Sequence, residues 1–421
     1  MSLSVRSVPA PIRLLSIGVL INNAGGYVSV FLALILAVRH TAAWKIGLAL
    51  LLAALFAIGG SALGGAGVSR IGSRQTIIAS MAGSAFFTAL LIATGSYPLT
   101  VALVCCVTVC NRAYMPAATT AIGRVSQPAE RVQRYAFFQL AYNIGAAIGP
   151  PMATFLLTRS LTALFLIDAV TSAAFALAAQ RLPPDRQPVP DAQPAPDSQP
   201  VPDPPLVPDA QPVPDPQPAP DSQPAPDTQT PPGPKPRRLR HDRRYLTFCL
   251  GVTCVATCYS QQSGALPLTI SRHHYNLELL GIFFSANAIA VIVFQLPVSY
   301  LTRRLPYAVP LTCGGVLICG GYAILLAGSV LPLLAVSVAL WTLGEIIFNP
   351  VTPAVAMMMS TPQTHGAYQG ALSTFRTTGQ VAGPALGVFA FSIRPSLPWA
   401  LCGVLAVAAA TLFITFSKDM Q

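Results

Sequence analysis

The sequence predicts an all-α membrane protein in which twelve transmembrane helices form two six-helix repeats around a central cavity. Three observations predict this fold class. Of the 421 residues, 53% are hydrophobic and 9% are charged, whereas soluble domains carry about 25% charged residues. Twelve stretches are apolar over the roughly 20 residues that a helix needs to cross a bilayer. A single constant shift along the chain, the one that takes Pro116 to Pro350, places the second half of the sequence over the first.

The runs of apolar residues define the predicted spans. They cover residues 12–37, 44–66, 76–94, 98–122, 135–158, 161–180, 245–270, 280–301, 307–328, 331–357, 367–392 and 397–416. With the N-terminus inside, 18 of the 25 lysines and arginines fall in inner segments and five in outer loops. Basic residues collect on the cytoplasmic side, so both termini are predicted to be cytoplasmic and the protein to lie in the cell membrane. The net charge of +11 then reflects topology and not a nucleic-acid partner.

Residues 183–244 form a different kind of segment between two bundles, at 1–182 and 245–421. Residues 183–236 hold 22 of the 40 prolines, and Asp recurs every six residues from Asp185 to Asp227. This composition cannot form a packed core, so we expect a disordered, extended tether. A docking site for a proline-recognising partner is the alternative. The basic run from Lys235 to Arg244 is expected to touch anionic lipid headgroups.

The internal repeat holds from the first span to the eleventh. The shift that aligns Pro116 with Pro350, called the repeat offset below, also pairs three residues of span 5 with three of span 11: Gly145 with Gly379, Gly149 with Gly383 and Pro150 with Pro384. Parallel repeats of this kind are typical of transporters, whose two halves rock around a site near the middle of the membrane.

Local motifs strengthen this interpretation. The loop between spans 2 and 3 matches the pattern G-x-L-A-D-R-x-G-R-K at Gly65, Arg70, Gly72 and Arg74, with Ser69 in place of the aspartate. Span 4 carries an arginine, Arg112, with Pro116 at the glycine of an R-x-x-x-G pattern. Span 5 reads Gly145-x3-Gly149-Pro150, and span 11 reads Gly370-x8-Gly379-x3-Gly383-Pro384-x2-Gly387.

With the 6+6 layout, these motifs resemble the major facilitator superfamily, and more narrowly its drug:proton antiporter branch. The resemblance implies a gating role for Arg70 and Arg74, although a plain topology signal explains these arginines as well. The glycines and prolines of spans 5 and 11 are expected to form the seam between the halves, because glycines four apart let two helix backbones approach closely. Tight packing without a gating role is the alternative.

Four ionisable residues stand clear of the span ends: Arg112, Asp168, Glu345 and Arg376. Such residues are costly in the membrane and are often functional. We predict a contact between Glu345 and Arg376 and assign Glu345 to proton coupling, with a static ion pair as the alternative. Asp168 is expected either to pack against a polar neighbour or to join a proton pathway. For Arg112 the resemblance implies proton handling, and a general effect on cavity electrostatics is the alternative.

Uncharged polar residues supply the candidate cargo contacts. In the resembled fold spans 1, 4, 7 and 10 line the cavity, which favours Asn23, Gln261 and Asn349 as substrate contacts. A hydrogen bond between helices is the alternative for each of them.

The sequence also disfavours several classes of protein and site. His273 and His274 lie near Glu278 without a third convergent ligand, so no metal site is expected, and we expect no cofactor. The absence of the motif G-x-x-x-x-G-K-[ST] excludes ATP-driven transport within the chain, and no hydrolase motif indicates an enzyme. The nine cysteines lie in apolar runs and are expected to act as small buried hydrophobic residues.

These inferences combine into one functional prediction. The chain is expected to be a monomeric, proton-coupled secondary transporter that exports a small amphipathic compound, such as an antibiotic or toxic metabolite, by antiport. The first alternative is an importer that moves a nutrient with protons or another ion. The second alternative is a transport-inactive receptor or scaffold that acts through the proline-rich segment.

Overall fold

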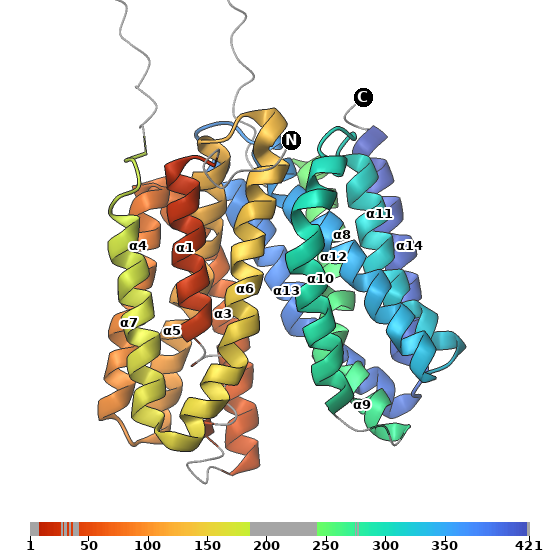
Figure 1. Cartoon of the computed structure of the whole chain (residues 1–421), viewed down its shortest axis with the longest axis horizontal. Helices are drawn as coiled ribbons and strands as arrows, with labels where there is room; N and C mark the ends of the chain where they lie inside the picture. The colour runs from red at the N-terminus through yellow and green to blue at the C-terminus, as the bar shows by residue number, and fades with distance from the viewer. Residues whose placement is uncertain are drawn as a thin grey trace, which may run out of the picture. The chain divides into compact units, whose positions relative to one another are not determined.

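The computed structural model describes residues 8–26, 28, 32, 35–36, 42–185, 242–273, 275 and 278–418. Every regular element in these ranges is a helix (Figure 1). Residues 1–185 and 238–421 belong to one compact unit. The predicted proline-rich tether lies almost wholly outside the described residues, and its boundaries stay a prediction.

Within the described residues, the first half of the chain contributes six helices of 16 to 29 residues. They are α1 (Ala10–Gly25), α3 (Ala43–Ile71), α4 (Ser73–Leu90), α5 (Tyr97–Arg124), α6 (Arg131–Arg159) and α7 (Leu161–Ala179). Two short 3-10 turns, Leu91–Ala93 and Pro128–Glu130, follow α4 and precede α6.

The second half follows the same plan. Its helices are α8 (Arg243–Tyr259), α9 (Ala265–Arg272), α10 (Glu278–Thr302), α11 (Ala308–Ala323), α12 (Leu331–Met359), α13 (His365–Ile393) and α14 (Leu397–Lys418). A 3-10 turn at Ser260–Ser263 joins α8 to α9, and another at Ile324–Ala327 follows α11.

Eight helical segments of the described residues are long and apolar enough to cross a membrane. They begin at Trp44, Ser73, Tyr97, Leu161, Leu279, Ala308, Leu331 and Leu397. The other four predicted spans also contain helices, but these helices are either short or polar. Helices α1 and α8 are 16 and 17 residues long, while α6 and α13 carry many amide, hydroxyl and guanidinium groups along their length.

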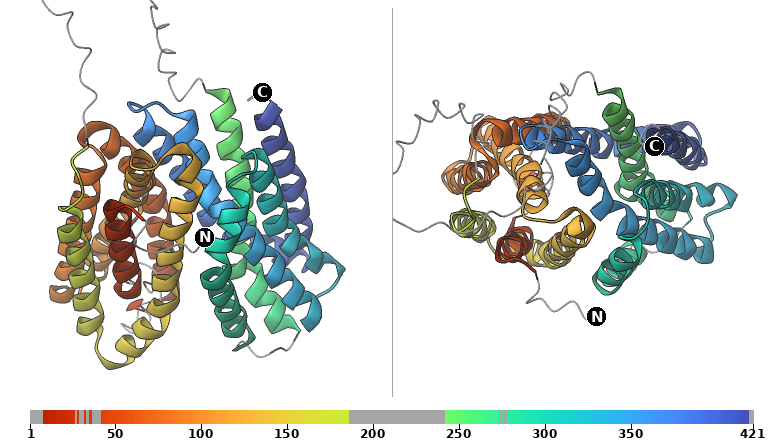
Figure 2. Two further views of the ribbon diagram at one scale, coloured as in Figure 1. Left: turned by 45° about the horizontal axis from the view of Figure 1, so that its top comes forward. Right: turned by 90° about the horizontal axis from the view of Figure 1, so that it is seen from above.

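The packing of helices repeats between the halves (Figure 2). Helix α1 packs on α6 as α8 packs on α13, and α4 packs on α5 and α7 as α11 packs on α12 and α14. The halves meet where α3 contacts α13 and, in the equivalent place, where α10 contacts α6. These equivalent helix contacts confirm the two-repeat fold that the repeat offset predicts.

The first helix of each half also ends at an equivalent position. Helix α1 ends at Gly25 and α8 ends at Tyr259, two residues that the repeat offset aligns. After each end the backbone leaves the helical path, and side chains satisfy freed polar groups: Asp168 accepts a hydrogen bond from the N–H of Val28 at 3.1 Å. Broken helices of this kind are tolerated in membranes where other protein groups take up the backbone hydrogen bonds.

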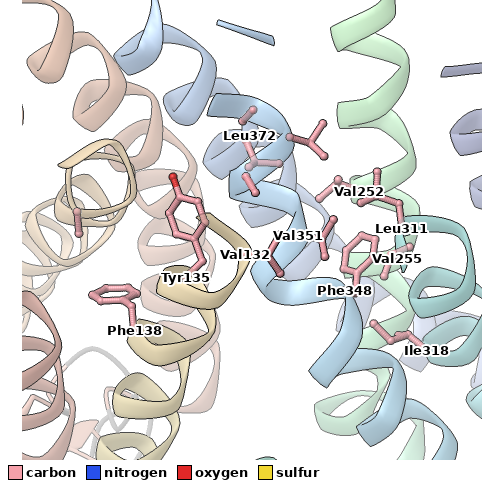
Figure 3. Close-up of a cluster of buried hydrophobic side chains, with 14 of the residues drawn as sticks. Val132, Tyr135, Phe138, Val252, Val255, Leu311, Ile318, Phe348, Val351 and Leu372 are labelled. Carbon is pink, nitrogen blue, oxygen red and sulfur yellow. The ribbon is translucent and has the colours of Figure 1, made fainter. Parts of the chain in front are cut away.

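Apolar side chains from both halves form the main buried core. Figure 3 shows part of it, in which Tyr135 of α6, Val255 of α8, Phe348 of α12 and Leu372 of α13 pack among other apolar residues. The start of α8 is fixed by Asp242, whose carboxylate accepts from the backbone N–H of Tyr245 at 3.1 Å and from the hydroxyl of Tyr368 on α13 at 2.7 Å. The core therefore holds the helix pairs that position the polar residues described below.

Candidate functional site

A small cavity of about 60 Å³ lies between the two halves. Helices α5 and α6 line it from the first half, and α12 and α13 from the second. The lining residues are Met115, Pro116, Thr119, Tyr135, Phe138, Gln139, Asn349, Thr352, Pro353, Gln369, Leu372, Ser373 and Arg376. Arg376 is the one charged residue among these described lining residues. Two predicted site residues, Asn349 and Arg376, therefore share one cavity.

Glu345 lies on α12 and is 4% exposed. The side-chain amide of Asn287 on α10 donates to Glu345 Oε2 at 3.0 Å and also to the hydroxyl oxygen of Thr342 at 3.1 Å. The amide of Asn349, one helical turn further along α12, reaches Glu345 Oε1 at 3.5 Å. The Tyr259 side chain also interacts with the carboxyl group. Neutral donors therefore surround this buried acid.

Arg376 does not form the predicted contact with Glu345. No ion pair joins the two side chains among the described residues, and Arg376 Nη2 instead donates to the hydroxyl of Thr352 at 2.6 Å. Arg376 and Glu345 therefore interact electrostatically without touching. The contact fails because Asn287 and Asn349 occupy the carboxylate, while Thr352 holds the guanidinium on the cavity side.

The other two predicted substrate contacts are engaged in hydrogen bonds within their own halves. Gln261 is 1% exposed, and its amide donates to the carbonyl of Gly383 on α13 at 2.8 Å. Asn23 donates to the carbonyl of Tyr142 on α6 at 3.3 Å. Asn23 therefore ties α1 to α6, and Gln261 ties the turn after α8 to α13. Both hydrogen bonds match the alternative interpretation, and neither residue lines the cavity.

Asp168 belongs to a polar network inside the first half. It is fully buried on α7 and, besides Val28, contacts the hydroxyl of Ser172 at 3.4 Å. Ser172 also donates to Asn22 of α1 at 3.0 Å and lies 3.5 Å from the Ser84 hydroxyl of α4. Within the described residues no lysine or arginine pairs with Asp168. The geometry thus gives Asp168 the polar neighbours that the packing hypothesis requires.

Arg112 is exposed on α5. It shares a helix face with Pro116 and Thr119, which lie four and seven residues further on and line the cavity. Its guanidinium therefore lies on the face of α5 that is turned towards the cavity, about one turn from the lining residues.

The glycine pattern of spans 5 and 11 packs within each half and not between them. A Cβ atom on Gly145 would lie 2.5 Å from the backbone oxygen of Leu20, and one on Gly379 would lie 2.6 Å from that of Thr253. Gly383 approaches Thr257 in the same way, and the backbone of Pro384 lies against Gly264. Gly149 is also buried on α6, while the side chain of Pro150 lies outside the described residues. For Gly145, Gly379 and Gly383 the prediction of a seam between the halves needs correcting, because each packs on the first helix of its own half, and Pro384 likewise contacts its own half; for Gly149 and Pro150 it stays a prediction.

A different glycine pair makes a close contact between the halves. A Cβ atom on Gly370 of α13 would collide with the Cα atom of Gly65 on α3. One turn away, Gly366 lies against Val68, and further along the same two helices the hydroxyls of Ser61 and Thr377 are 3.0 Å apart. These contacts lie in the C-terminal half of α3 and the N-terminal half of α13. The two halves are therefore closed against each other at the end of the molecule where α3 ends and α13 begins.

The loop between α3 and α4 shows how the Ser69 departure is accommodated. The Ser69 hydroxyl donates to Gly65 within α3, at 3.2 Å. Asp185, which follows α7, instead brings a carboxylate to this loop: it accepts from the backbone N–H and hydroxyl of Ser73 and pairs with Arg124 at 2.7 Å. Asp185 is a functional candidate that the sequence analysis missed, since it is the first residue of a repeat that otherwise indicates a tether.

The two arginines of this loop have different surroundings. Arg74 donates to the backbone oxygen of Gln180 at 2.7 Å, which ties the start of α4 to the end of α7. Arg70 is exposed near the end of α3. As for metals, no group of three or more His, Cys, Asp or Glu residues converges in the part of the chain that the structure describes; His274 lies outside that part.

Comparison with known proteins agrees with the fold. The sequence model of the Major Facilitator Superfamily matches residues 14–384 and 248–420. Two uncharacterized MFS-type transporters of Bacillus subtilis (strain 168) are similar: YqjV is 26% identical over 149 residues, 35% of this chain and 36% of YqjV. YttB is 24% identical over 161 residues, 37% of this chain and 40% of YttB. The matches thus span well under half the length of these curated relatives.

Solved structures show the same architecture. The human organic anion transporter MFSD10 (TETRAN) superposes with a TM-score of 0.70 at 14% sequence identity, over 96% of this chain and all of that one. A bacterial homologue of the iron transporter ferroportin, in an outward-facing state, gives a TM-score of 0.70 at 12% identity, over 97% of this chain and all of that one. With the sequence match across nearly its whole length, the chain belongs to the major facilitator superfamily.

Proposed function

We propose that this transporter is a proton-coupled secondary carrier of small amphipathic compounds, with Glu345 as the residue that takes up and releases the proton. One observation carries the proposal: Glu345 is buried at membrane depth among neutral donors, with no ion-pair partner in the described structure. Insertion of a charged residue at the centre of a transmembrane helix costs at least about 2.5–3.5 kcal/mol. Protonation removes that charge, so a change in the surroundings of Glu345 changes its occupancy by a proton.

The geometry supports a link between the proton and the cargo. Asn349 lines the cavity and also donates to Glu345, at the long distance of 3.5 Å. Arg376 lines the same cavity and interacts electrostatically with Glu345. A cargo molecule that takes over either group alters the balance between the ionised and the neutral carboxyl group. The proton and the cargo are thus coupled through side chains that lie between them.

Export is the direction that we propose, on the strength of the antiporter-like glycine and proline pattern in spans 5 and 11. Import together with a proton is a second candidate, and the position of Arg376 favours it: an anion on Arg376 and a proton on Glu345 would each make the other more favourable. In either case we propose a monomer in the cell membrane, with cytoplasmic termini and the basic segment from Lys235 to Arg244 against anionic lipids.

Transport in everted membrane vesicles tests the proton site. Compounds identified by a toxicity screen of cells with and without the gene are followed in vesicles with an imposed proton gradient. Glu345→Gln is expected to abolish gradient-driven transport, whereas Glu130→Gln, which changes an acid near the surface, should retain it. Gradient-driven transport at the wild-type rate by a folded Glu345→Gln variant would refute the proposal. The sign of the gradient that drives accumulation decides between export and import.

A further inference from the structure

We propose that the cargo carries an anionic group, specifically a carboxylate, which binds Arg376 in the cavity between the halves. This inference rests on the proposed proton-coupled carrier, in its second form of import together with a proton, and names the class of compound that it moves. The starting point is the charge of the cavity wall, where Arg376 is the single charged residue and no aspartate or glutamate is among the described lining residues.

The guanidinium of Arg376 has donors to spare. A guanidinium carries five N–H donors, and the structure shows one side-chain hydrogen bond from it, to Thr352. No carboxylate lies within ion-pair distance of Arg376 among the described residues. A planar guanidinium recognises a carboxylate through two parallel hydrogen bonds, which ammonium groups and amides cannot reproduce.

The neutral part of the cavity wall suits the same head group. The amides of Asn349 and Gln139 each have a second N–H beyond the one that they donate to Glu345 and Asn143, and Ser373 offers a hydroxyl; these groups can donate to a carboxylate oxygen. The volume of about 60 Å³ is far below the roughly 300–1,000 Å³ of sites for drug-sized molecules. In this conformation the cavity therefore has room for a polar head group, and not for a large amphipathic body.

A second positive charge lies on one of the helices that line the cavity. Arg112 is exposed on the face of α5 that continues into the cavity lining at Pro116 and Thr119. The carboxylate of Glu345, in contrast, is 4% exposed and lies behind the amides of Asn287 and Asn349. The accessible charges near the cavity are thus guanidinium groups, whereas the acid is buried, and this distribution attracts anions and disfavours cations.

This arrangement determines the sign of the coupling between cargo and proton. An anion on Arg376 adds negative charge near Glu345, and it can draw the amide of Asn349 away from the carboxylate. Both effects disfavour the ionised form of Glu345. Anion binding therefore favours protonation, and by thermodynamic reciprocity protonation favours anion binding. A cationic cargo would have the opposite dependence on pH.

Binding to the purified full-length protein tests the inference with three probes of matched shape: benzoate, benzamide and benzylammonium. We expect benzoate alone to raise the melting temperature, and its apparent affinity to be at least threefold higher at pH 5.5 than at pH 7.5. Arg376→Gln should weaken benzoate binding at least tenfold and Arg376→Lys by a smaller factor. Arg394→Gln, which removes an exposed arginine at the end of the same helix, should leave binding unchanged.

Two outcomes would overturn the inference: stabilisation by benzamide or benzylammonium equal to that by benzoate, or no stabilisation by benzoate. Equal benzoate binding by a folded Arg376→Gln or Arg376→Lys variant would do the same. Glu345→Gln separates this inference from the proposed function, because it should keep benzoate binding while the pH dependence disappears. Persistent pH dependence in Glu345→Gln would remove Glu345 as the proton site and leave the anion site standing. If transport depended on Glu345 but only neutral or cationic compounds were moved, Glu345 would stand as the proton site and the anion site would be refuted.

Discussion

Replacement of Gly370 by alanine should open the end of the transporter that the two halves close. The new Cβ atom would collide with the Cα atom of Gly65 and lie 3.1 Å from its backbone nitrogen. Both neighbours are backbone atoms of α3, so no side chain can rotate away to make room. Helices α3 and α13 must therefore separate at this point or shift along each other.

The size of the effect follows from this overlap. Insertion of a methyl group into a tightly packed interface costs about 1–3 kcal/mol. The cost falls only on the conformation in which Gly65 and Gly370 touch, because the conformation that is open at this end does not contain the contact. The ratio of closed to open molecules should therefore fall by a factor of about 5–150.

Distances between two spin labels report this shift. Cysteines at Gln127 and Leu305 place labels in exposed turns of the two halves near the closed end, after Cys313, an exposed native cysteine, is replaced by serine. Gly370→Ala should move population from the short to the long distance. Gly59→Ala is the matched control, because a Cβ atom on that glycine of α3 meets nothing within 4 Å. An unchanged distance distribution in Gly370→Ala would refute the reasoning.

Three further predictions concern groups other than the contact between Gly65 and Gly370. Asp185→Asn should destabilise the first half by about 1 kcal/mol in thermal unfolding, since it breaks the ion pair with Arg124 and weakens the cap of α4; Glu130→Gln should cost less than about half of that. His365 precedes the predicted eleventh span, and burial, together with nearby arginines, lowers its pKa to about 4. Because the unfolded chain then binds a proton more readily, stability should fall by on the order of 1–2 kcal/mol as the pH falls from about 6.5 to 4, and His365→Gln should flatten that slope. Asp168→Asn should retain transport and folding, whereas Asp168→Ala should lower stability by about 1–3 kcal/mol because it leaves buried donors without an acceptor.

The sequence predicts the helices and their repeat well because both depend on patterns that survive in the linear order of residues. Apolar length marks each span, and the repeat offset aligns even the ends of α1 and α8. The same offset indicates that Glu345 and Arg376 replace Asn111 and Tyr142 of the first half. The fold explains why Glu345 and Arg376 lie near one cavity, but it does not predict that the two side chains form no ion pair.

The hydrogen-bond partners of the polar residues could not be predicted from the sequence, because several polar side chains compete for each of them. Asn287 and Thr352 are unremarkable in the sequence, yet they hold Glu345 and Arg376 apart. The glycines of spans 5 and 11 do permit close helix contacts, as their spacing predicts, but spacing alone does not identify the partner helix. Gly65 belonged to the loop motif, and only the packing shows that it meets Gly370.

The buried acids of the two halves lie at positions that the repeat does not align. This asymmetry limits where proton binding can be coupled to cargo binding. The repeat offset aligns Asp168 with Cys402 and Ser84 with Ile318, so the polar network of the first half has an apolar counterpart in the second.

The reverse holds at the cavity, where Glu345 and Arg376 have uncharged counterparts in Asn111 and Tyr142. Asp168 is enclosed by α1, α4 and α7 of its own half, whereas Asn349 connects Glu345 to a space that both halves line. A rocking motion between rigid halves changes the surroundings of groups at the seam far more than those inside one half. The second half should therefore carry the proton. The first half should line the opposite side of the cavity, so that its movement changes the surroundings of Glu345 and with them the protonation of Glu345.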